Sequence, residues 1–227
     1  AGGRWGAAAE ATPRAASGGA SPNPRADASA APAAARTRPP FAASSAPLLE
    51  EESEGWELAL IGAVGNLDLE LIWFDQEIDN EIIFDLAGYS GYLQTTGTSQ
   101  SEGLEIIASL PLSERWRIEG NFTSLDATQQ NGDDRAYRPD QTGQVSIVWT
   151  RNDLRARVTG RYTGEATDPF MTSIDDTFTI DLSAQWDVSD RWALEARVLN
   201  VTDHDDQQLP GYYVPGMTAY AGVRVKL

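Results

Sequence analysis

The sequence predicts an all-β fold, an antiparallel meander of about nine long strands with one apolar and one polar face. Three observations support this prediction. Nine segments between residues 54 and 227 alternate apolar and polar residues with the period of two that is typical of a β-strand. Tight turns and long polar loops alternate between these segments. Tryptophans lie in phase with the apolar residues. Together these features indicate part of the wall of a transmembrane β-barrel.

Each predicted strand is defined by the residues of its apolar face. In the first four strands these are Trp56, Leu58 and Leu60, then alternate residues of 67–73, 104–110 and 116–122. In the last five they are alternate residues of 145–149, 154–162, 178–186, 192–198 and 221–227. The other face is polar and includes Arg155, Arg157 and Arg161. Within the first long connection, Ile82-Ile83-Phe84 is a candidate extension of this ladder.

The connections predict which end of the sheet each loop occupies. Short turns are predicted at residues 65–66, 111–114, 151–153 and 187–191, and long loops at about 76–101, 125–141, 164–176 and 200–216. Because short and long connections alternate strictly, the turns share one end of the sheet and the loops share the other. Outer-membrane barrels show this asymmetry, with periplasmic turns and external loops.

The tryptophans are expected to form two belts at the lipid interfaces. Four of them lie beside short turns: Trp116, Trp149, Trp186 and Trp192. Trp56 and Trp73 lie towards the loops. A soluble β-sandwich also has alternating strands, but strands of about ten residues are long for one, and its tryptophans would lie at the rim of the core.

Residues 1–50 differ from the rest of the chain. They are rich in Ala, Pro, Ser, Gly and Arg and show no period of 2 or 3.6. Such a segment buries too little apolar surface to offset its ordering entropy, so we expect a disordered low-complexity segment. A linker and an out-of-frame reading of GC-rich DNA both account for it. The fold is therefore assigned to residues 51–227. No apolar signal-peptide core follows Arg4, so we expect an exported protein that lacks its start.

Composition excludes several classes of function. A net charge of −17 disfavours nucleic acid. The absence of cysteine excludes disulfides and thiolate metal sites. No run of 18 apolar residues encodes a membrane helix. No catalytic constellation is visible, so we predict no enzyme activity and no cofactor.

Five stretches resemble, in order, the C-terminal part of TonB-dependent outer-membrane receptors. They are Glu51-Glu52-Ser53-Glu54-Gly55-Trp56-Glu57-Leu58, the hairpin at residues 72–83, Ser101-Glu102-Gly103-Leu104-Glu105, Tyr137-Arg138-Pro139-Asp140-Gln141 and Leu199-Asn200-Val201-Thr202-Asp203. The resemblance implies an outer-membrane location, a 22-stranded barrel with a plug, the TonB complex and lipid as partners, and uptake of a siderophore, cobalamin or similar ligand.

The chain also departs from the family pattern. It ends in Leu227 where the family ends in an aromatic residue, and Pro215-Gly216-Met217 stands for the usual "PGR". With nine predicted strands and neither a plug nor a TonB-contacting box, the resemblance implies a truncated piece. We expect such a piece not to close into a barrel alone, because it has two free edges.

Four tyrosines in long loops are the candidate ligand residues: Tyr89, Tyr92, Tyr212 and Tyr213. Exposed aromatic rings there would grip an apolar or aromatic ligand, although ordinary loop packing explains them as well. The arginine row at 155, 157 and 161 would guide anions or, as we favour, pair with Glu119, Asp181 and Glu195.

The acidic loops at residues 203–206, which include His204, and at 131–134 suggest Ca²⁺ ligands. Solvated loops are the favoured interpretation, and we predict no metal site.

The leading hypothesis is therefore a fragment of a TonB-dependent transporter. A passive porin-like barrel and a soluble ligand-binding β-sandwich are the alternatives.

Overall fold

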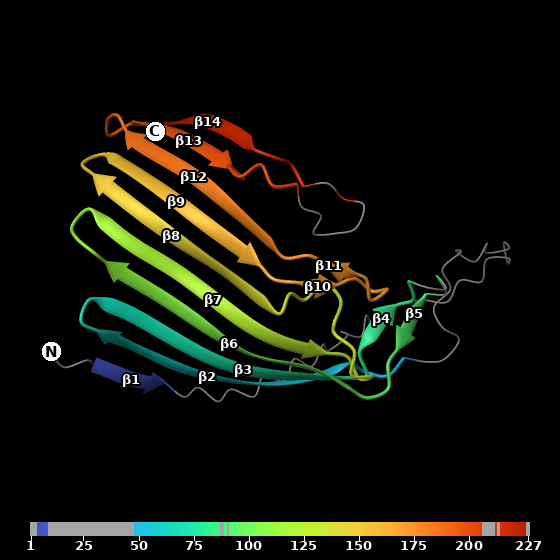
Figure 1. Ribbon diagram of the computed structural model, residues 1–227. Coiled ribbons are helices and arrows are strands. Elements are labelled where there is room, and N and C mark those ends of the chain that lie inside the picture. The colour runs from blue at the N-terminus through green and yellow to red at the C-terminus, as the bar shows by residue number, and fades with distance from the viewer. Residues whose placement is uncertain are drawn as a thin grey trace, which may run out of the picture.

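One curved antiparallel sheet dominates the molecule (Figure 1). The computed structural model describes residues 4–8, 48–86, 89, 91–205, 212 and 214–225. Within this part of the chain, no helix is long and apolar enough to cross a bilayer. Lys226 and Leu227, the end of the last predicted strand, lie outside the described residues.

Nine strands follow one another in the sheet in chain order. They are β2 (Glu52–Val64), β3 (Leu67–Asp79), β6 (Thr98–Pro111), β7 (Trp116–Thr128), β8 (Gln141–Arg151), β9 (Leu154–Thr163), β12 (Thr177–Asp187), β13 (Trp192–Leu199) and β14 (Thr218–Val225). Two small hairpins lie outside the sheet, β4 (Ile82–Phe84) with β5 (Tyr92–Gln94), and β10 (Ala166–Thr167) with β11 (Ser173–Ile174). The predicted nine-stranded meander is confirmed. Residues 82–84 do form a strand, but it pairs only with β5 outside the sheet, so the expectation that this segment extends the ladder is wrong.

The strand register places the predicted apolar residues on one face of the whole sheet. Along one row across the strands, Ile147 pairs with Val158, Val158 with Leu182, and Leu182 with Val198. Because paired residues point to the same side, these side chains form one continuous apolar surface.

This apolar face is not covered by any described part of the chain. Seventeen of its large apolar side chains are exposed, among them Trp56, Leu58, Val145, Phe178 and Val223. Only Val148, Ile174 and Ala193 are buried apolar residues in the described structure. A β-sandwich needs a second sheet packed on the first, and the described strands form no such layer, which contradicts the sandwich alternative.

The apolar band has the length of a membrane-spanning β-strand. On β12 it covers the nine residues from Phe178 to Trp186, and a tilted transmembrane strand needs about 9–11 residues. Beyond it, the same face turns acidic in a row formed by Asp75, Glu102 and Asp126. Several strands continue past this row, so β3, β6 and β7 are longer than the apolar pattern predicted.

Short turns gather at one end of the sheet and long loops at the other, as predicted (Figure 1). Gly65, in the first turn, has a φ of 63°, a left-handed conformation that costs glycine least. Trp116 and Trp149 are direct cross-strand partners near the turn end, with ring centroids 6.3 Å apart. The belt expected there is therefore present on the apolar face.

The large sheet contains one strand that the apolar pattern does not predict. β1 (Arg4–Ala8) pairs antiparallel with residues 59–63 of β2. Pairing at a sheet edge uses backbone groups, so a strand can add there without side-chain alternation. Of the other residues of the segment predicted to be disordered, 48–50 form no helix or strand, and 1–3 and 9–47 lie outside the described structure.

Candidate functional site

The polar face carries a network of ion pairs. Arg157 Nη2 donates to Glu119 Oε2 at 2.8 Å, and Arg161 Nε donates to Asp181 Oδ2 at 2.9 Å. This confirms the expected pairing for two of the three arginines. The remaining expected acid, Glu195, pairs with Arg224 of β14 instead. The polar face is thus largely self-neutralised along β7, β9 and β12.

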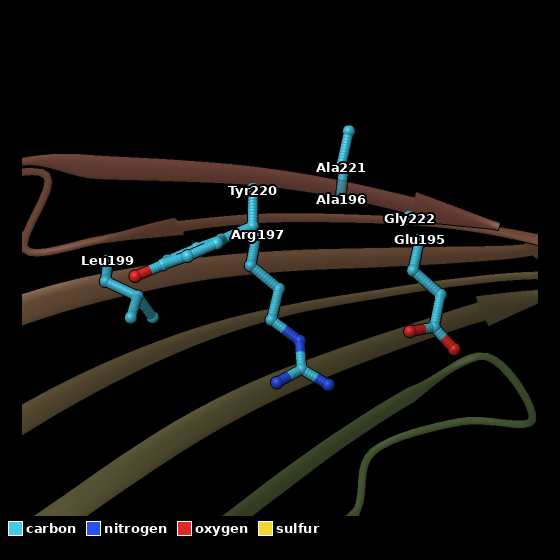
Figure 2. A pocket seen from close by; sticks show the side chains of 7 residues that line it. All are labelled: Glu195, Ala196, Arg197, Leu199, Tyr220, Ala221 and Gly222. Carbon is cyan, nitrogen blue, oxygen red and sulfur yellow. The ribbon is translucent and has the colours of Figure 1, made fainter.

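A hollow of about 450 Å³ lies beside the last two strands (Figure 2). Arg197 and Tyr220 are cross-strand partners on its polar side, and the side chains of Arg197 and Glu195 project to the same side of the ribbon. Ala221 projects to the opposite side, because its position in the strand is shifted by one residue. This hollow is shallow and lies at the edge of the described sheet.

The β4–β5 hairpin presents two of the predicted tyrosines. Tyr92 is the cross-strand partner of Phe84, and their ring centroids lie 5.7 Å apart at 79°. Tyr89 packs edge-on to the same Phe84 ring at 6.1 Å. Both tyrosines remain more than half exposed, at 62% and 55%. The structure therefore brings Tyr89 and Tyr92 together around one shared ring.

Half-buried polar contacts hold this hairpin against the neighbouring loop. Arg135 Nη2 donates to Glu81 Oε1 at 2.5 Å, and the two side chains are only 17% and 16% exposed. Ser99, which is fully buried, donates to Glu81 Oε2 at 2.6 Å. On the other side of the hairpin, Gln94 Nε2 donates to the Asn80 carbonyl at 2.8 Å. Glu81 thus links the hairpin to both β6 and the loop at residues 129–140.

Tyr212 belongs to a different loop, at residues 200–217 between β13 and β14, and is 71% exposed. In strand order this loop lies far from the β4–β5 hairpin, so the described structure does not bring Tyr212 to Tyr89 or Tyr92. Tyr213 lies outside the described residues. The predicted ligand-binding role of these tyrosines stays a prediction.

Asn200 organises the start of this loop. Its amide Nδ2 donates to the His204 carbonyl at 2.9 Å, and its Oδ1 accepts from Thr202 at 2.9 Å and from the His204 N–H at 3.1 Å. Asp203 Oδ1 accepts from the Met217 N–H at 2.7 Å across the loop. The side chains of Asn200 and Asp203, which belong to the stretch that resembles a family motif, therefore fix the backbone of this loop.

The acidic loops do not gather into a metal centre within the described structure. No group of three or more His, Asp or Glu side chains there is arranged to hold an ion. Asn131 and Asp133 instead bond each other, with Asn131 Nδ2 donating to Asp133 Oδ2 at 2.7 Å. Asp206 lies outside the described residues.

Two further loops build a cavity that sequence analysis did not predict. It measures about 320 Å³ and is lined by Tyr137, Pro139, Thr163, Gly164, Ala166, Ile174, Asp175 and Thr177. Thr163 and Thr177 are cross-strand partners on the polar face, so the cavity opens on that side of the wall. Tyr137 lies in a stretch with family resemblance, but the sequence does not indicate its φ of 58° or its backbone hydrogen bond to Thr167 of β10.

A larger hollow of about 490 Å³ adjoins this cavity and shares Ala166 with it. Its lining includes Asp126, Asp134, Asp140 and Glu165, with Arg138 as the one lining cation. Ser124 and Gln141 in its lining are partners on the apolar face, so it opens on the outer side of the wall. The smaller cavity therefore opens on the polar face of the wall, and the larger hollow opens on its apolar side.

An uncovered apolar face, an ion-paired polar face and structured loops at one end define a section of an outer-membrane barrel. The chain belongs to the TonB dependent receptor-like β-barrel family, whose model matches residues 4–201. Members of this family are outer-membrane transporters and not enzymes.

Solved structures share this fold. The pyoverdine outer membrane receptor FpvA of Pseudomonas aeruginosa PAO1 is 18% identical with a TM-score of 0.64, over 79% of this chain and 30% of that one. The ferric-catecholate import receptor Fiu of E. coli K12 is 19% identical with a TM-score of 0.61, over 82% and 30%. The copper transporter OprC is 14% identical with a TM-score of 0.68, over 79% and 32%. This chain thus spans about a third of the length of these structures.

Proposed function

We propose that this chain is the C-terminal part of the barrel of a larger TonB-dependent transporter. The complete barrel would have 22 strands and a plug, would couple to the TonB complex, and would take up a siderophore, cobalamin or similarly scarce ligand. The observation that best supports this proposal is the asymmetry of the sheet. Its band of exposed apolar side chains has the length of a membrane-spanning strand, and the long loops gather at one end of the sheet.

The loop end supplies the groups that such a ligand needs. Tyr89 and Tyr92 offer exposed rings on a hairpin that is fixed by the Glu81–Arg135 pair. Rings held by a braced element lose little freedom when a ligand binds, which favours affinity. The names of the similar structures refer to pyoverdine, catecholate and copper. Ferric siderophores are therefore the first ligands to test.

Uptake of ⁵⁵Fe bound to pyoverdine or to enterobactin, by iron-starved cells that express the intact receptor, tests the proposal. We expect saturable uptake that disappears in a strain without TonB. Replacing Tyr89 and Tyr92 by Ala should raise the KM of uptake, whereas replacing both by Phe should preserve most of it because the rings remain. Uptake that is equal with and without TonB would contradict active transport, and a steady ionic conductance in bilayers would then favour the passive pore.

A further inference from the structure

We propose that the cavity between the loops at residues 129–140 and 164–176 is a ligand subsite for a single ring that carries a positive charge or a neutral donor. The inference rests on the proposed function, because it assigns one part of the ligand to one part of the loop end. It does not involve the tyrosines that the sequence singled out.

The walls of the cavity are tied together by backbone hydrogen bonds. The Tyr137 N–H donates to the Thr167 carbonyl at 2.8 Å, and the Gly164 N–H donates to the Gln141 carbonyl at 2.7 Å. The β10–β11 turn is closed by Asp168, whose Oδ1 accepts from the backbone N–H groups of Phe170 and Thr172, both at 2.8 Å. Asp168 is buried at 7% exposure. The cavity is therefore preformed, as ligand sites usually are.

Close packing at the floor depends on a glycine. A Cβ atom at Gly164 would lie 2.4 Å from Asp140 Oδ1 and 3.0 Å from the Gln141 carbonyl oxygen. A side chain here would displace the Asp140 carboxylate and press against the backbone of Gln141 at the start of β8. Gly164 thus permits the approach that gives the cavity its shape.

The lining determines the kind of group that fits. Tyr137, Pro139, Ala166 and Ile174 supply apolar surface, while Thr163 and Thr177 supply hydroxyls on the polar face. A volume of about 320 Å³ is at the lower end of the range for ligand pockets, so it suits one ring group and not a whole siderophore.

The charge of the lining favours a cation. Asp175 is exposed at the cavity and is the only charged residue in its lining. The face of an aromatic ring such as that of Tyr137 attracts a cation, and a carboxylate beside it adds to the attraction. An anionic group would meet repulsion from Asp175 with no lining cation to offset it.

Two probes that share a ring and differ in charge test this inference. The intact receptor in detergent is titrated with 4-fluorophenethylamine, a cation, and with 4-fluorophenylacetate, an anion, and ¹⁹F line broadening reports binding. We expect saturable binding of the amine and weaker binding of the acetate, by roughly fivefold or more, the scale of one partly exposed charge pair. Equal affinity for the two probes, or no saturable binding of the amine, would overturn the inference.

Neighbouring carboxylates provide a matched control. Asp175→Asn should weaken amine binding by roughly threefold to fivefold. Asp176→Asn changes the net charge equally one residue away, but Asp176 does not line the cavity, so it should have little effect. Equal losses in the two variants would show long-range attraction and no subsite. Thr163→Phe, which fills the cavity, should abolish binding.

The outcomes separate this inference from the proposed function. If the probes fail to discriminate while TonB-dependent iron uptake persists, the subsite is wrong and the transporter stands. If the amine binds as expected and uptake does not depend on TonB, the cavity exists in a protein with another function.

Discussion

The strand wall and the loop end of this molecule are stabilised by different interactions. In the wall, each strand pairs with the next, and the side chains alternate between a mainly apolar and a mainly polar face. At the loop end, contacts join residues that are far apart in sequence, such as Glu81 with Arg135 and Tyr137 with Thr167. The stability of the wall therefore depends on the medium that contacts its apolar face, whereas the stability of the loop end depends on individual hydrogen bonds.

The largest effect is expected from a charge on the apolar face of the wall. Leu182→Arg would place a guanidinium in the middle of the lipid-facing band, opposite Val158 and Val198. The cost of a cation at the bilayer midplane is about 2–4 kcal/mol. Denaturant unfolding of the wild type and the variant in lipid vesicles measures this loss in the free energy of unfolding.

Gln185→Arg is the matched control for this prediction. It lies three residues away on the polar face, between Arg155 and Glu195. Its stability should stay within about 0.5 kcal/mol of the wild type. If the two variants lose the same stability, the assignment of the faces is wrong.

At the loop end, removing the half-buried ion pair should have a smaller and more local effect. Arg135→Ala leaves Glu81 without its cation, and losing a hydrogen bond to a charged group costs about 1.5–3 kcal/mol. Amide hydrogen exchange should accelerate at residues 82–94, while the amides of β8 and β9 keep their protection. Arg135→Lys should recover part of the protection. Amide exchange that accelerates equally across the whole sheet would contradict a local stabilising role for the Glu81–Arg135 pair.

A hydrogen bond on the polar face of the wall offers an intermediate case. Ser146 Oγ and Thr159 Oγ1 are 2.8 Å apart and both residues are buried. Thr159→Val leaves the Ser146 hydroxyl unpaired, at a cost of about 1–2 kcal/mol. The double variant Ser146→Ala/Thr159→Val should be closer to the wild type than Thr159→Val alone. Additive losses in a double-mutant cycle would show that the pair does not interact.

The smallest effect is expected for an exposed ion pair. Arg161 is 55% exposed, so Arg161→Ala should cost less than about 1 kcal/mol. Asp181→Ala should cost more, because Asp181 Oδ1 also accepts from the Asn200 backbone N–H at 2.9 Å. Thermal unfolding of the two variants compares them directly. Equal losses would mean that the Asn200 contact contributes nothing.

The same contrast explains how much of the structure could be predicted. The wall was predictable because period-two alternation, as at residues 178–186, specifies both a strand and its face. The extension of β3 to Asp79 was missed because the apolar alternation ends at Trp73: Asp75 and Glu77 follow on the apolar face, whereas Phe74 and Ile78 lie on the polar face. β1 was missed because edge pairing needs no side-chain pattern.

Little of the candidate site could be predicted in the same way. Tyr89 and Tyr92 were singled out by their position in a predicted long loop, but their shared partner Phe84 emerged only from the β4–β5 pairing. The cavity at Tyr137 depends on the β10–β11 hairpin, whose strands have two residues each, and on the backbone hydrogen bond from Tyr137 to Thr167. Such contacts have no periodic signature in the sequence.

Spin labelling along β12 tests most directly the claim that one face of the wall contacts lipid. The chain has no cysteine, so single cysteines at residues 178–186 can be labelled in a cysteine-free receptor in vesicles. Collisions with oxygen, which concentrates in lipid, should peak at the even positions, including Leu182. Collisions with a water-soluble nickel chelate should peak at the odd positions, including Ser183. Accessibility without this alternation, or with the opposite phase, would contradict the account.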